Sequence, residues 1–362
     1  MKKVVIGMSG GVDSSVAAIE LQKQGYEVIG LFMRNWDSLA DGELNGPTTA
    51  SGICPQEEDY NDAKKVCDKL GIPLHRKDFV KEYYDYVFKY FLDELEKGRT
   101  PNPDIMCNKY IKFDMFVKEA EKLGADYIAT GHYARIREED WKYHLLQWVD
   151  SWKDQSYFLS GLSQYQLSKS IFPLWEMTKQ QVREKAKKIW LPNAERKDSQ
   201  GLCFIWNVPI RTFLMQKFPK KEWDILDLNW KKVWTHQWAY FYTIGQKQWL
   251  WLNFKAYVYR IDIENNILYV TDKDAEELKT KTLIAKNWHW ICPDMESEIL
   301  NWNNNLSGKI RYRQIPAVEC CLDKMGNWDM KVTFEKEQRA VAPGQVFVAY
   351  DWDECLGNGM IA

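Results

Sequence analysis

The amino-terminal segment has the hydrophobic pattern of a strand, a helix and a second strand. Residues 4–6 form a short apolar run, and apolar residues then recur at helical spacing from Val16 to Leu21, until Gly25 ends the helix. Another apolar run follows at residues 28–33. Strands that alternate with helices in this way are typical of a parallel sheet with helices on both faces. We therefore expect an α/β fold for this part of the chain.

The pattern changes near residue 208. Before that point we expect further helices and a strand at about 57–70, 81–97, 109–123 and 126–130. After it the chain shows short alternating runs with turn signals, as in YVYRIDIENNILYVTD, which are typical of β structure. The sequence predicts three domains: a doubly wound parallel-sheet domain (1–208), a small central β-rich domain (209–278) and a C-terminal β-barrel of six-stranded type (279–362).

Composition and charge narrow the possible classes of protein. The chain has 362 residues, of which 45% are hydrophobic and 28% charged, as in soluble globular proteins. No apolar run approaches the roughly 20 residues that cross a bilayer, and no signal peptide precedes MKKVVIGMSG. We therefore expect a cytoplasmic protein without a membrane partner. The formal net charge of −2 excludes a polycation, so local basic patches would have to hold any nucleic acid.

The cysteines do not form a metal site. All eight (54, 67, 107, 203, 292, 320, 321 and 355) lack the spacing of zinc or iron–sulfur ligands, so we predict no bound metal centre among them. Cys67 falls on the apolar face of a helix, and Cys320 and Cys321 lie in a strand-like run. We expect these three side chains to pack in the core.

Two other cysteines stand alone in polar surroundings. Cys107 follows Asp104 by three residues, after the two prolines of PNP, which predict a stiff loop. Cys203 lies in KDSQGLCFI, in a segment that also reads as a loop. Neither has a neighbour at the spacing of a redox pair, so each is a candidate for chemistry of its own.

The segment SGGVDSS, residues 9–15, lies between the first strand and the first helix. Gly10 and Gly11 let the backbone approach a ligand, and the amides of the helix N-terminus present a positive dipole to it. The segment can be an ordinary glycine turn, but its serines favour a phosphate cradle, and the missing GxxxxGK[ST] excludes a Walker A loop. SGGVDSS resembles the signature of the PP-loop ATP pyrophosphatases. The resemblance implies that ATP binds here, with Asp13 assisting Mg²⁺ near the β- and γ-phosphates.

Further motifs make the resemblance more specific. In order, the chain contains GMSGGVDSS, FMRNW, RTPNPDIMCNKYIKF, ATGHYAR, KDQSYFLSGLS, KDSQGLCFI, YTIGQ, RYRQ and APGQ. Together these segments closely resemble the tRNA-specific 2-thiouridylase family, over nearly the whole chain. The long motif around PNPD is highly specific for that family, whereas APGQ alone would carry no weight.

The resemblance implies thiolation of the wobble uridine of tRNA. ATP would adenylate the oxygen on carbon 2 of the uracil, and sulfur held as a persulfide on Cys203 would then attack that carbon and release AMP. Cys107 would attack the persulfide and leave a Cys107–Cys203 disulfide. A cysteine desulfurase or a sulfur-relay protein would supply the sulfur. Asp104 would act as a base or contact the uracil, and because its charge raises the pKa of a nearby thiol, a cation such as Lys109 would have to offset it.

The resemblance also assigns binding residues. ATP would contact Gly7, Met8, Ser9, Gly10, Gly11, Val12, Asp13, Ser14, Met33 and Gly131. The anticodon loop would contact Asn102, Pro103, Asp104, His132, Lys153, Asp154, Gln155, Arg311, Tyr312 and Gln345. His132 can equally be a buried structural histidine. Clustered cations can hold phosphates or form a solvated surface; they are Arg183, Lys185, Lys187 and Lys188 on a helix, Lys217, Lys220 and Lys221 in a loop, and Arg311 and Arg313 in the barrel.

Two alternatives remain open at this level. A PP-loop synthetase acting on a small metabolite would need neither Cys107 nor Cys203 and would not bind tRNA. An inactive tRNA-binding relative would need no intact phosphate cradle. The intact SGGVDSS and the two cysteines argue against the second alternative.

The chain contains 18 tryptophans, nearly as many as its 20 glycines. Several stand where a turn or a helix end requires a left-handed residue: Trp141, Trp190, Trp230, Trp328 and Trp352. Others stand where the family usually has glycine: Trp148, Trp175, Trp206, Trp234, Trp238 and the loop GQKQWLWL. Our hypothesis is that the gene decodes UGA as glycine and that these positions are glycines read with another table, whereas Trp36 and Trp290 match the family. The alternative is an aromatic-rich variant.

Overall fold

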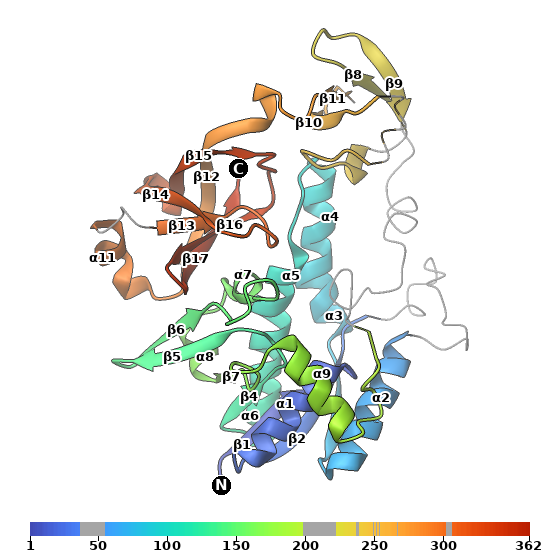
Figure 1. Cartoon of the computed structure of the whole chain (residues 1–362), viewed down its shortest axis with the longest axis vertical. Helices are drawn as coiled ribbons and strands as arrows, with labels where there is room; N and C mark the ends of the chain where they lie inside the picture. Colours follow the sequence, from blue (N-terminus) through green and yellow to red (C-terminus); the bar gives the residue numbers. More distant parts are fainter. Residues whose placement is uncertain are drawn as a thin grey trace. The chain divides into compact units, whose positions relative to one another are not determined.

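The structure is a computed structural model that describes residues 1–36, 55–197, 222–236, 239–248, 250, 252, 254–265, 267–301 and 306–362 (Figure 1). The chain divides into two compact units, which are described separately. Unit 1 comprises Met1–Phe88, Pro103–Val208 and Asp353–Cys355, and unit 2 comprises Lys89–Asn102, Pro209–Trp352 and Leu356–Ala362.

Unit 1 contains the parallel sheet that the sequence predicts. Its order is β3-β2-β1-β4-β7, formed by β1 (Lys3–Gly7), β2 (Glu27–Arg34), β3 (Leu74–Asp78), β4 (Tyr127–Ala129) and β7 (Ser170–Ile171). All four pairings are parallel, and Ile6 lies opposite both Gly30 and Ala129. The strand order reverses direction between β1 and β4. In such sheets a ligand binds at this switch point, beyond the carboxyl ends of the strands.

Helices cover this sheet and bury its apolar side chains. They include α1 (Val12–Lys23), α2 (Pro55–Leu70) and α9 (Lys179–Lys188). Val16 of α1, Val182 of α9 and Ile6 of β1 belong to one buried cluster, and all three are 0% exposed. Cys67 of α2 lies in the same cluster, as predicted, and burial raises the pKa of its thiol to about 11. The remaining elements of unit 1 include the hairpin β5 (Arg135–Glu139) and β6 (Lys142–Leu146), and the short helices α7 (Ser156–Leu159) and α8 (Gln164–Ser168).

The region around Asp104 and Cys107 is helical, so the predicted loop is wrong. Helix α5 (Pro103–Met106) runs into a π-helix, η2 (Cys107–Met115), and then into α6 (Phe116–Lys122). Pro103 is the first helical residue, where its fixed φ favours the helix and its missing N–H costs nothing. A π-helix also divides the helix predicted at 81–97, into α3 (Val80–Tyr83), η1 (Tyr84–Phe88) and α4 (Lys89–Glu96).

Unit 2 is β-rich. One sheet has the order β10-β11-β8-β9, from β8 (Trp223–Leu226), β9 (Lys232–His236), β10 (Tyr257–Asp262) and β11 (Ile267–Thr271). The order β12-β15-β14-β13-β16-β17 closes through a β12–β17 pairing into the expected six-stranded barrel. Its strands are β12 (Lys279–Trp290), β13 (Leu306–Lys309), β14 (Val318–Lys324), β15 (Met330–Arg339), β16 (Val346–Asp351) and β17 (Glu354–Ile361), and α11 (Glu296–Asn301) follows β12.

The two adjacent cysteines of β14 point to opposite faces. Cys320 lies in the barrel core with Phe334 and Phe347, and burial raises the pKa of its thiol to about 12. Cys321 is exposed, so the prediction that it packs in the core is wrong. Successive side chains of a strand alternate between faces, and only one of the pair can therefore face the core.

Among the residues that the structure describes, five tryptophans have positive φ angles. They are Trp141 (62°), Trp190 (57°), Trp230 (62°), Trp328 (61°) and Trp352 (52°), and their exposed fractions range from 68% to 91%. A bulky aromatic residue rarely adopts this conformation. The structure thus places a left-handed residue at each turn where the sequence predicts one.

Helix α9 ends in a Schellman motif centred on Trp190. The amide of Trp190 donates to the carbonyl of Lys187, and that of Leu191 donates to Ala186. The same pair of bonds surrounds Gly25, Gly71, Gly98 and Gly124 at four other helix ends, where φ lies between 66° and 82°. Trp190 thus occupies a position that glycine fills elsewhere in this chain.

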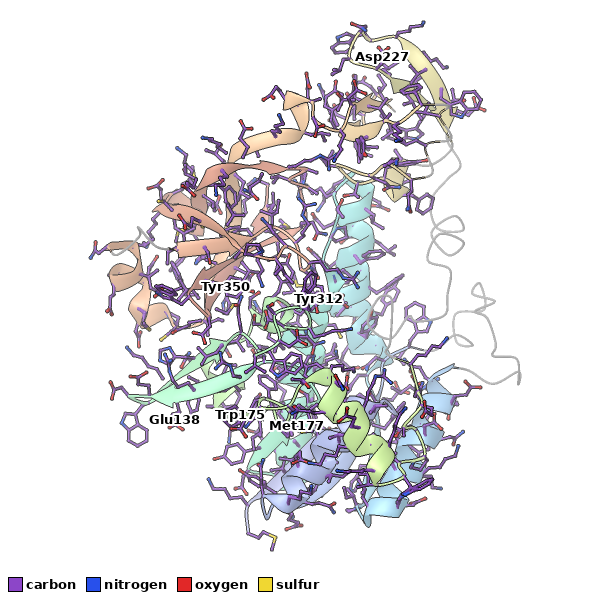
Figure 2. The ribbon with its side chains drawn as sticks, in the orientation of Figure 1. Glu138, Trp175, Met177, Asp227, Tyr312 and Tyr350 are labelled. Carbon is purple, nitrogen blue, oxygen red and sulfur yellow. The ribbon has the colours of Figure 1, made fainter. Side chains whose placement is uncertain are left out.

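Trp230 occupies the corresponding position in a hairpin. The turn between β8 and β9 begins at Asp227 (Figure 2), whose amide donates to the carbonyl of Lys231, while the amide of Trp230 donates to Asp227. The loop therefore has three residues, and its last residue is left-handed. Such loops usually have glycine at this position.

Candidate active site

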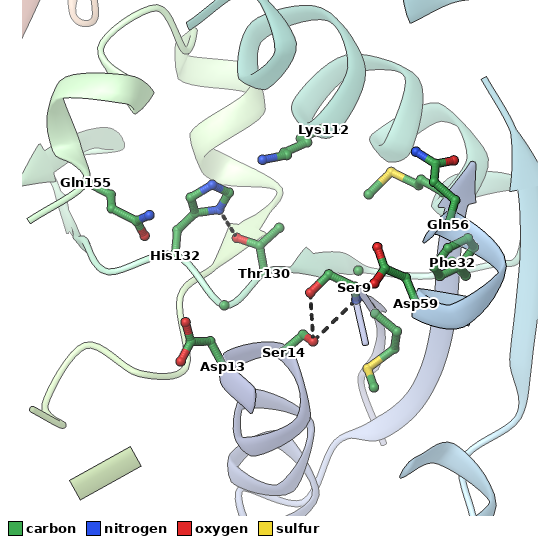
Figure 3. A pocket seen from close by; sticks show the side chains of 14 residues that line it. Ser9, Asp13, Ser14, Phe32, Gln56, Asp59, Lys112, Thr130, His132 and Gln155 are labelled. Atoms are coloured by element: carbon green, nitrogen blue, oxygen red, sulfur yellow. Dashed lines mark hydrogen bonds between the residues drawn. The ribbon is translucent and has the colours of Figure 1, made fainter. Parts of the chain in front are cut away.

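A cavity of about 210 Å³ lies at the switch point of the parallel sheet (Figure 3). Gly7 ends β1 and Thr130 follows β4, so both lie at carboxyl ends of neighbouring strands. One part of the lining is apolar and is formed by Met8, Phe32 and Met33. The rest is formed by Gly7, Ser9, Asp13, Ser14, Gln56, Asp59, Lys112, Thr130, Gly131, His132 and Gln155.

The glycine turn at residues 9–11 forms the floor beside helix α1. Gly10 has a φ of 73°, and a Cβ there would lie 2.4 Å from the carbonyl oxygen of Asp59. Only glycine therefore fits. The hydroxyls of Ser9 and Ser14 lie 3.2 Å apart, and that of Ser9 also accepts the amide of Gly11 at 3.3 Å. Free amides at the start of a 12-residue helix, together with these hydroxyls, make an anion-binding site.

Two residues after α9, Asn193 and Arg196, hold this turn in place by hydrogen bonds. Asn193, which is buried, donates its amide Nδ2 to the carbonyl of Gly10 at 2.8 Å and to Ser15 Oγ at 2.9 Å. Arg196 donates to the same carbonyl at 3.4 Å and forms ion pairs with Asp59 and with Asp62. No local pattern in the sequence indicates Asn193 and Arg196 as site residues, because they lie more than 180 positions from the turn.

Asp13 is held by two side chains from other elements. Tyr133 donates its hydroxyl to Oδ1 at 2.7 Å, and Lys179 Nζ lies 2.7 and 2.8 Å from the two carboxylate oxygens. The ammonium of Lys179 also lies 5.3 Å from the centre of the Tyr133 ring. Lys179 is the first residue of α9, and it belongs to no sequence motif that would indicate a role in the site.

Gly131 and His132 form the opposite wall. A Cβ on Gly131 would lie 2.9 Å from the amide nitrogen of Ser14, so glycine permits close packing of this loop against α1. His132 Nδ1 is 2.8 Å from Thr130 Oγ1. Burial lowers the pKa of His132 well below its ordinary value of 6.5, and the positive charge of Lys112 lowers it further. The imidazole is therefore neutral at pH 7.

The predicted catalytic residues lie on the helix that borders the cavity. Cys107 is fully buried and is the first residue of the π-helix η2, while Asp104 is half-buried on α5. Neither lines the cavity; Lys112, from the same π-helix, does. Burial lowers the pKa of Lys109. Cys203 lies outside the described residues.

The loop 153–155 has mixed roles. Lys153 is exposed. Asp154 is buried and accepts bonds from the amides of Trp148 (3.0 Å) and Ser156 (3.1 Å), so it supports its own loop. Gln155 lines the cavity and accepts the amide of Tyr133 at 2.8 Å.

The remaining tRNA candidates belong to unit 2. Arg311 is exposed after β13 and donates to the carbonyl of Arg339, and Tyr312 (Figure 2) is half-buried beside it in sequence. Gln345 donates its amide Nε2 to the carbonyl of Thr100 at 2.9 Å. This bond holds the segment that leads through the buried Asn102 to α5.

The basic helix α9 is partly neutralised. Lys185 pairs with Glu20 and Lys187 pairs with Glu195, which favours a structural role for these two cations. Arg183 donates to the carbonyl of Arg196 at 3.2 Å. The basic loop Lys217, Lys220 and Lys221 lies outside the described residues, as do Trp206 and Trp238.

Family models match the chain in three parts. They are described as a tRNA methyl transferase HUP domain (residues 2–207), a tRNA methyl transferase PRC-barrel domain (211–272) and an aminomethyltransferase beta-barrel domain (280–361). Within the described part of the chain, no helix is long and apolar enough to cross a bilayer.

Curated relatives match almost from end to end. The tRNA-specific 2-thiouridylases MnmA of Staphylococcus aureus strains bovine RF122 / ET3-1 and JH9 are each 44% identical over 364 residues, covering 99% of this chain and 95% of the relative. Among solved structures, a 4-thiouridine synthetase–RNA complex with bound ATP is 19% identical, with a TM-score of 0.37, over 59% of this chain and 50% of the other. NMN synthetase from Francisella tularensis is 17% identical, with a TM-score of 0.32, over 54% and 66%.

Proposed function

The chain belongs to the tRNA-specific 2-thiouridylase family, and on this premise we propose that it replaces the carbon-2 oxygen of a wobble uridine in tRNA by sulfur, using ATP. The observation that carries the proposal is the cavity at the switch point. It joins an anion-binding turn to an apolar recess and to a neutral His132, beside the helix of Cys107. The three matched segments also support the proposed domains 1–208, 209–278 and 279–362.

The residues of the cavity fit ATP. The triphosphate would lie on the amides of α1 and on the hydroxyls of Ser9 and Ser14, where Gly10 leaves room for it. The adenine would pack against Met33 and the other apolar side chains of the recess. Asp13 would assist Mg²⁺ near the β- and γ-phosphates, because a carboxylate is the kind of ligand that Mg²⁺ prefers.

Activation of the uridine comes first. The carbon-2 oxygen attacks the α-phosphorus, the bond from that phosphorus to the bridging oxygen breaks, and pyrophosphate leaves with the electron pair. Asp104 takes the proton from nitrogen 3 of the uracil, which then shares a double bond with carbon 2. The product carries AMP, a good leaving group, on carbon 2.

Sulfur transfer follows. The terminal sulfur of a Cys203 persulfide attacks carbon 2, and the bond from carbon 2 to oxygen breaks, releasing AMP. The Cys107 thiolate then attacks Sγ of Cys203, the sulfur–sulfur bond breaks toward the uracil, and nitrogen 3 regains a proton. The two cysteines are oxidised to a disulfide, which an external thiol reduces.

The length of the chain after Arg196 limits how far Cys203 can lie from Gly10. Cys203 follows Arg196 by seven residues, which span at most about 25 Å. Arg196 itself contacts the carbonyl of Gly10 in the glycine turn at residues 9–11. A donor protein, either a cysteine desulfurase or a sulfur-relay protein, would load Cys203, and the tRNA would be held through its anticodon loop with the uridine turned out of its stack.

The test follows label from α-³²P-ATP into unmodified tRNA, with and without a persulfide donor. The proposal expects labelled tRNA without the donor and 2-thiouridine with it, and label should accumulate in Cys107→Ser and Cys203→Ser. AMP formed equally well without tRNA would indicate a synthetase acting on a small metabolite. Bound tRNA without any label would indicate an inactive relative.

A further inference from the structure

Lys112 is the only lysine or arginine among the described residues that line the cavity. It belongs to the π-helix η2, and its side chain extends toward His132, across from Ser9 and Ser14 (Figure 3). The cavity therefore has an anion-binding turn on one side and a single ammonium on the other.

The lining also contains two carboxylates, those of Asp13 and Asp59. Asp13 is bonded to Lys179, and Asp59 is bonded to Arg196, so each carboxylate already faces a cation on another element. His132 is neutral, because desolvation and the positive charge of Lys112 both lower its pKa. Lys112 therefore adds a positive charge to the wall of the cavity that lies opposite Ser9 and Ser14.

Lys112 lies on the same π-helix as Cys107, the proposed sulfur-transfer residue. In a π-helix each amide pairs with the carbonyl five residues earlier, so Lys112 lies one turn after Cys107. π-helical turns are frequent at functional sites. The same rigid element thus presents the ammonium to the cavity and carries the thiol.

From this geometry we infer that Lys112 is a further catalytic residue, which contacts the α-phosphate of ATP. The inference rests on the proposed function. Negative charge builds up on the non-bridging α-oxygens as the uridine oxygen attacks and the bond to pyrophosphate breaks. A fixed ammonium stabilises that charge, and it also stabilises AMP as it leaves carbon 2. Lys112 keeps its proton throughout and is neither acid nor base.

The experiment measures single-turnover adenylation of tRNA in Lys112→Met, with Lys112→Gln as a second variant should the first fail to fold. We expect the rate constant to fall about 100-fold or more, as when one electrostatic stabiliser is removed. The Kd for ATP should change far less, and Lys112→Arg should recover part of the rate. Lys118→Met is the matched control, because Lys118 is exposed on α6 of the same helical run and pairs with Asp114 at 2.9 Å.

A second readout separates catalysis from structure. Replacing either non-bridging α-oxygen of ATP by sulfur should slow the wild-type protein unequally for the two diastereomers, and Lys112→Met should lose this preference. A folded Lys112→Met with normal ATP binding and an unchanged rate constant would overturn the inference alone. Failure of the wild-type protein to bind ATP would instead overturn the proposed ATP site.

Discussion

Lys179 Nζ lies 2.7 and 2.8 Å from the two carboxylate oxygens of Asp13, across 166 positions of sequence. The side chain of Lys179 is 14% exposed, and that of Asp13 lines the cavity. The pair therefore links helix α9 to the first turn of helix α1, at the end of the cavity where the terminal phosphates of ATP would lie.

This pair predicts a role for Lys179 in pyrophosphate binding. When Mg²⁺ and ATP engage Asp13, the ammonium can turn to the β- and γ-phosphates. Lys179→Met should raise the KM for ATP about tenfold and weaken inhibition by inorganic pyrophosphate by a similar factor, since a charge-assisted hydrogen bond contributes about 1.5–3 kcal/mol. Lys188→Met, at an exposed position of the same helix, is the control and should alter neither constant. Unchanged pyrophosphate inhibition in Lys179→Met would contradict the prediction.

The cysteines should separate activation from sulfur transfer. We expect Cys107→Ser and Cys203→Ser each to reduce 2-thiouridine formation below detection, while adenylated tRNA still forms at more than half the wild-type rate. Mass spectrometry of the modified nucleoside and of labelled tRNA measures the two steps. Cys67→Ser is the control for loss of a buried thiol, and it should lower stability without removing activity. Thiolation at the normal rate in Cys107→Ser would refute the shared mechanism.

His132 predicts a loss of stability in mild acid. Its pKa is lowered in the folded protein, so below pH 6.5 the unfolded chain binds a proton that the folded chain does not. The free energy of unfolding should therefore be unaffected by this group above pH 6.5 and fall below it, by up to about 1.4 kcal/mol per pH unit. Urea unfolding at pH 7.5 and 5.5 measures the difference. It should shrink in His132→Gln and persist in a variant of the exposed His75.

The tryptophans with positive φ predict stabilising substitutions. Trp190→Gly should raise the free energy of unfolding by about 1–2 kcal/mol, because a left-handed conformation costs an L-residue that much and glycine little. Trp290→Gly is the contrast, since this buried side chain fills the barrel core and its loss should destabilise by several kcal/mol.

Codons test the related hypothesis directly. UGA codons at Trp190, Trp230 and Trp249, together with glycine in the mass of the natural protein, would establish that the lineage reads UGA as glycine. UGG at these three positions would end the idea.

Local patterns in the sequence were sufficient to predict the parallel sheet, the barrel and the glycine turn at residues 9–11. Strand and helix periodicity extends over neighbouring residues, and Gly10 must be glycine because its own backbone has a positive φ. The left-handed residues at Trp190 and Trp230 were also predictable, since helix ends and hairpins impose their conformation within a few residues.

Tertiary structure alone decided which distant side chains complete the site. Lys179 contacts Asp13, and Asn193 and Arg196 contact Gly10, in each case across more than 160 positions. The residues near them in sequence do not indicate these contacts. The sequence did not predict the π-helix at Cys107, because PNP favours an extended chain. In the structure the helix nevertheless begins at Pro103. The packing of this helix buries Cys107 and directs the side chain of Lys112 into the cavity. It is set by contacts among segments that lie far apart in the chain.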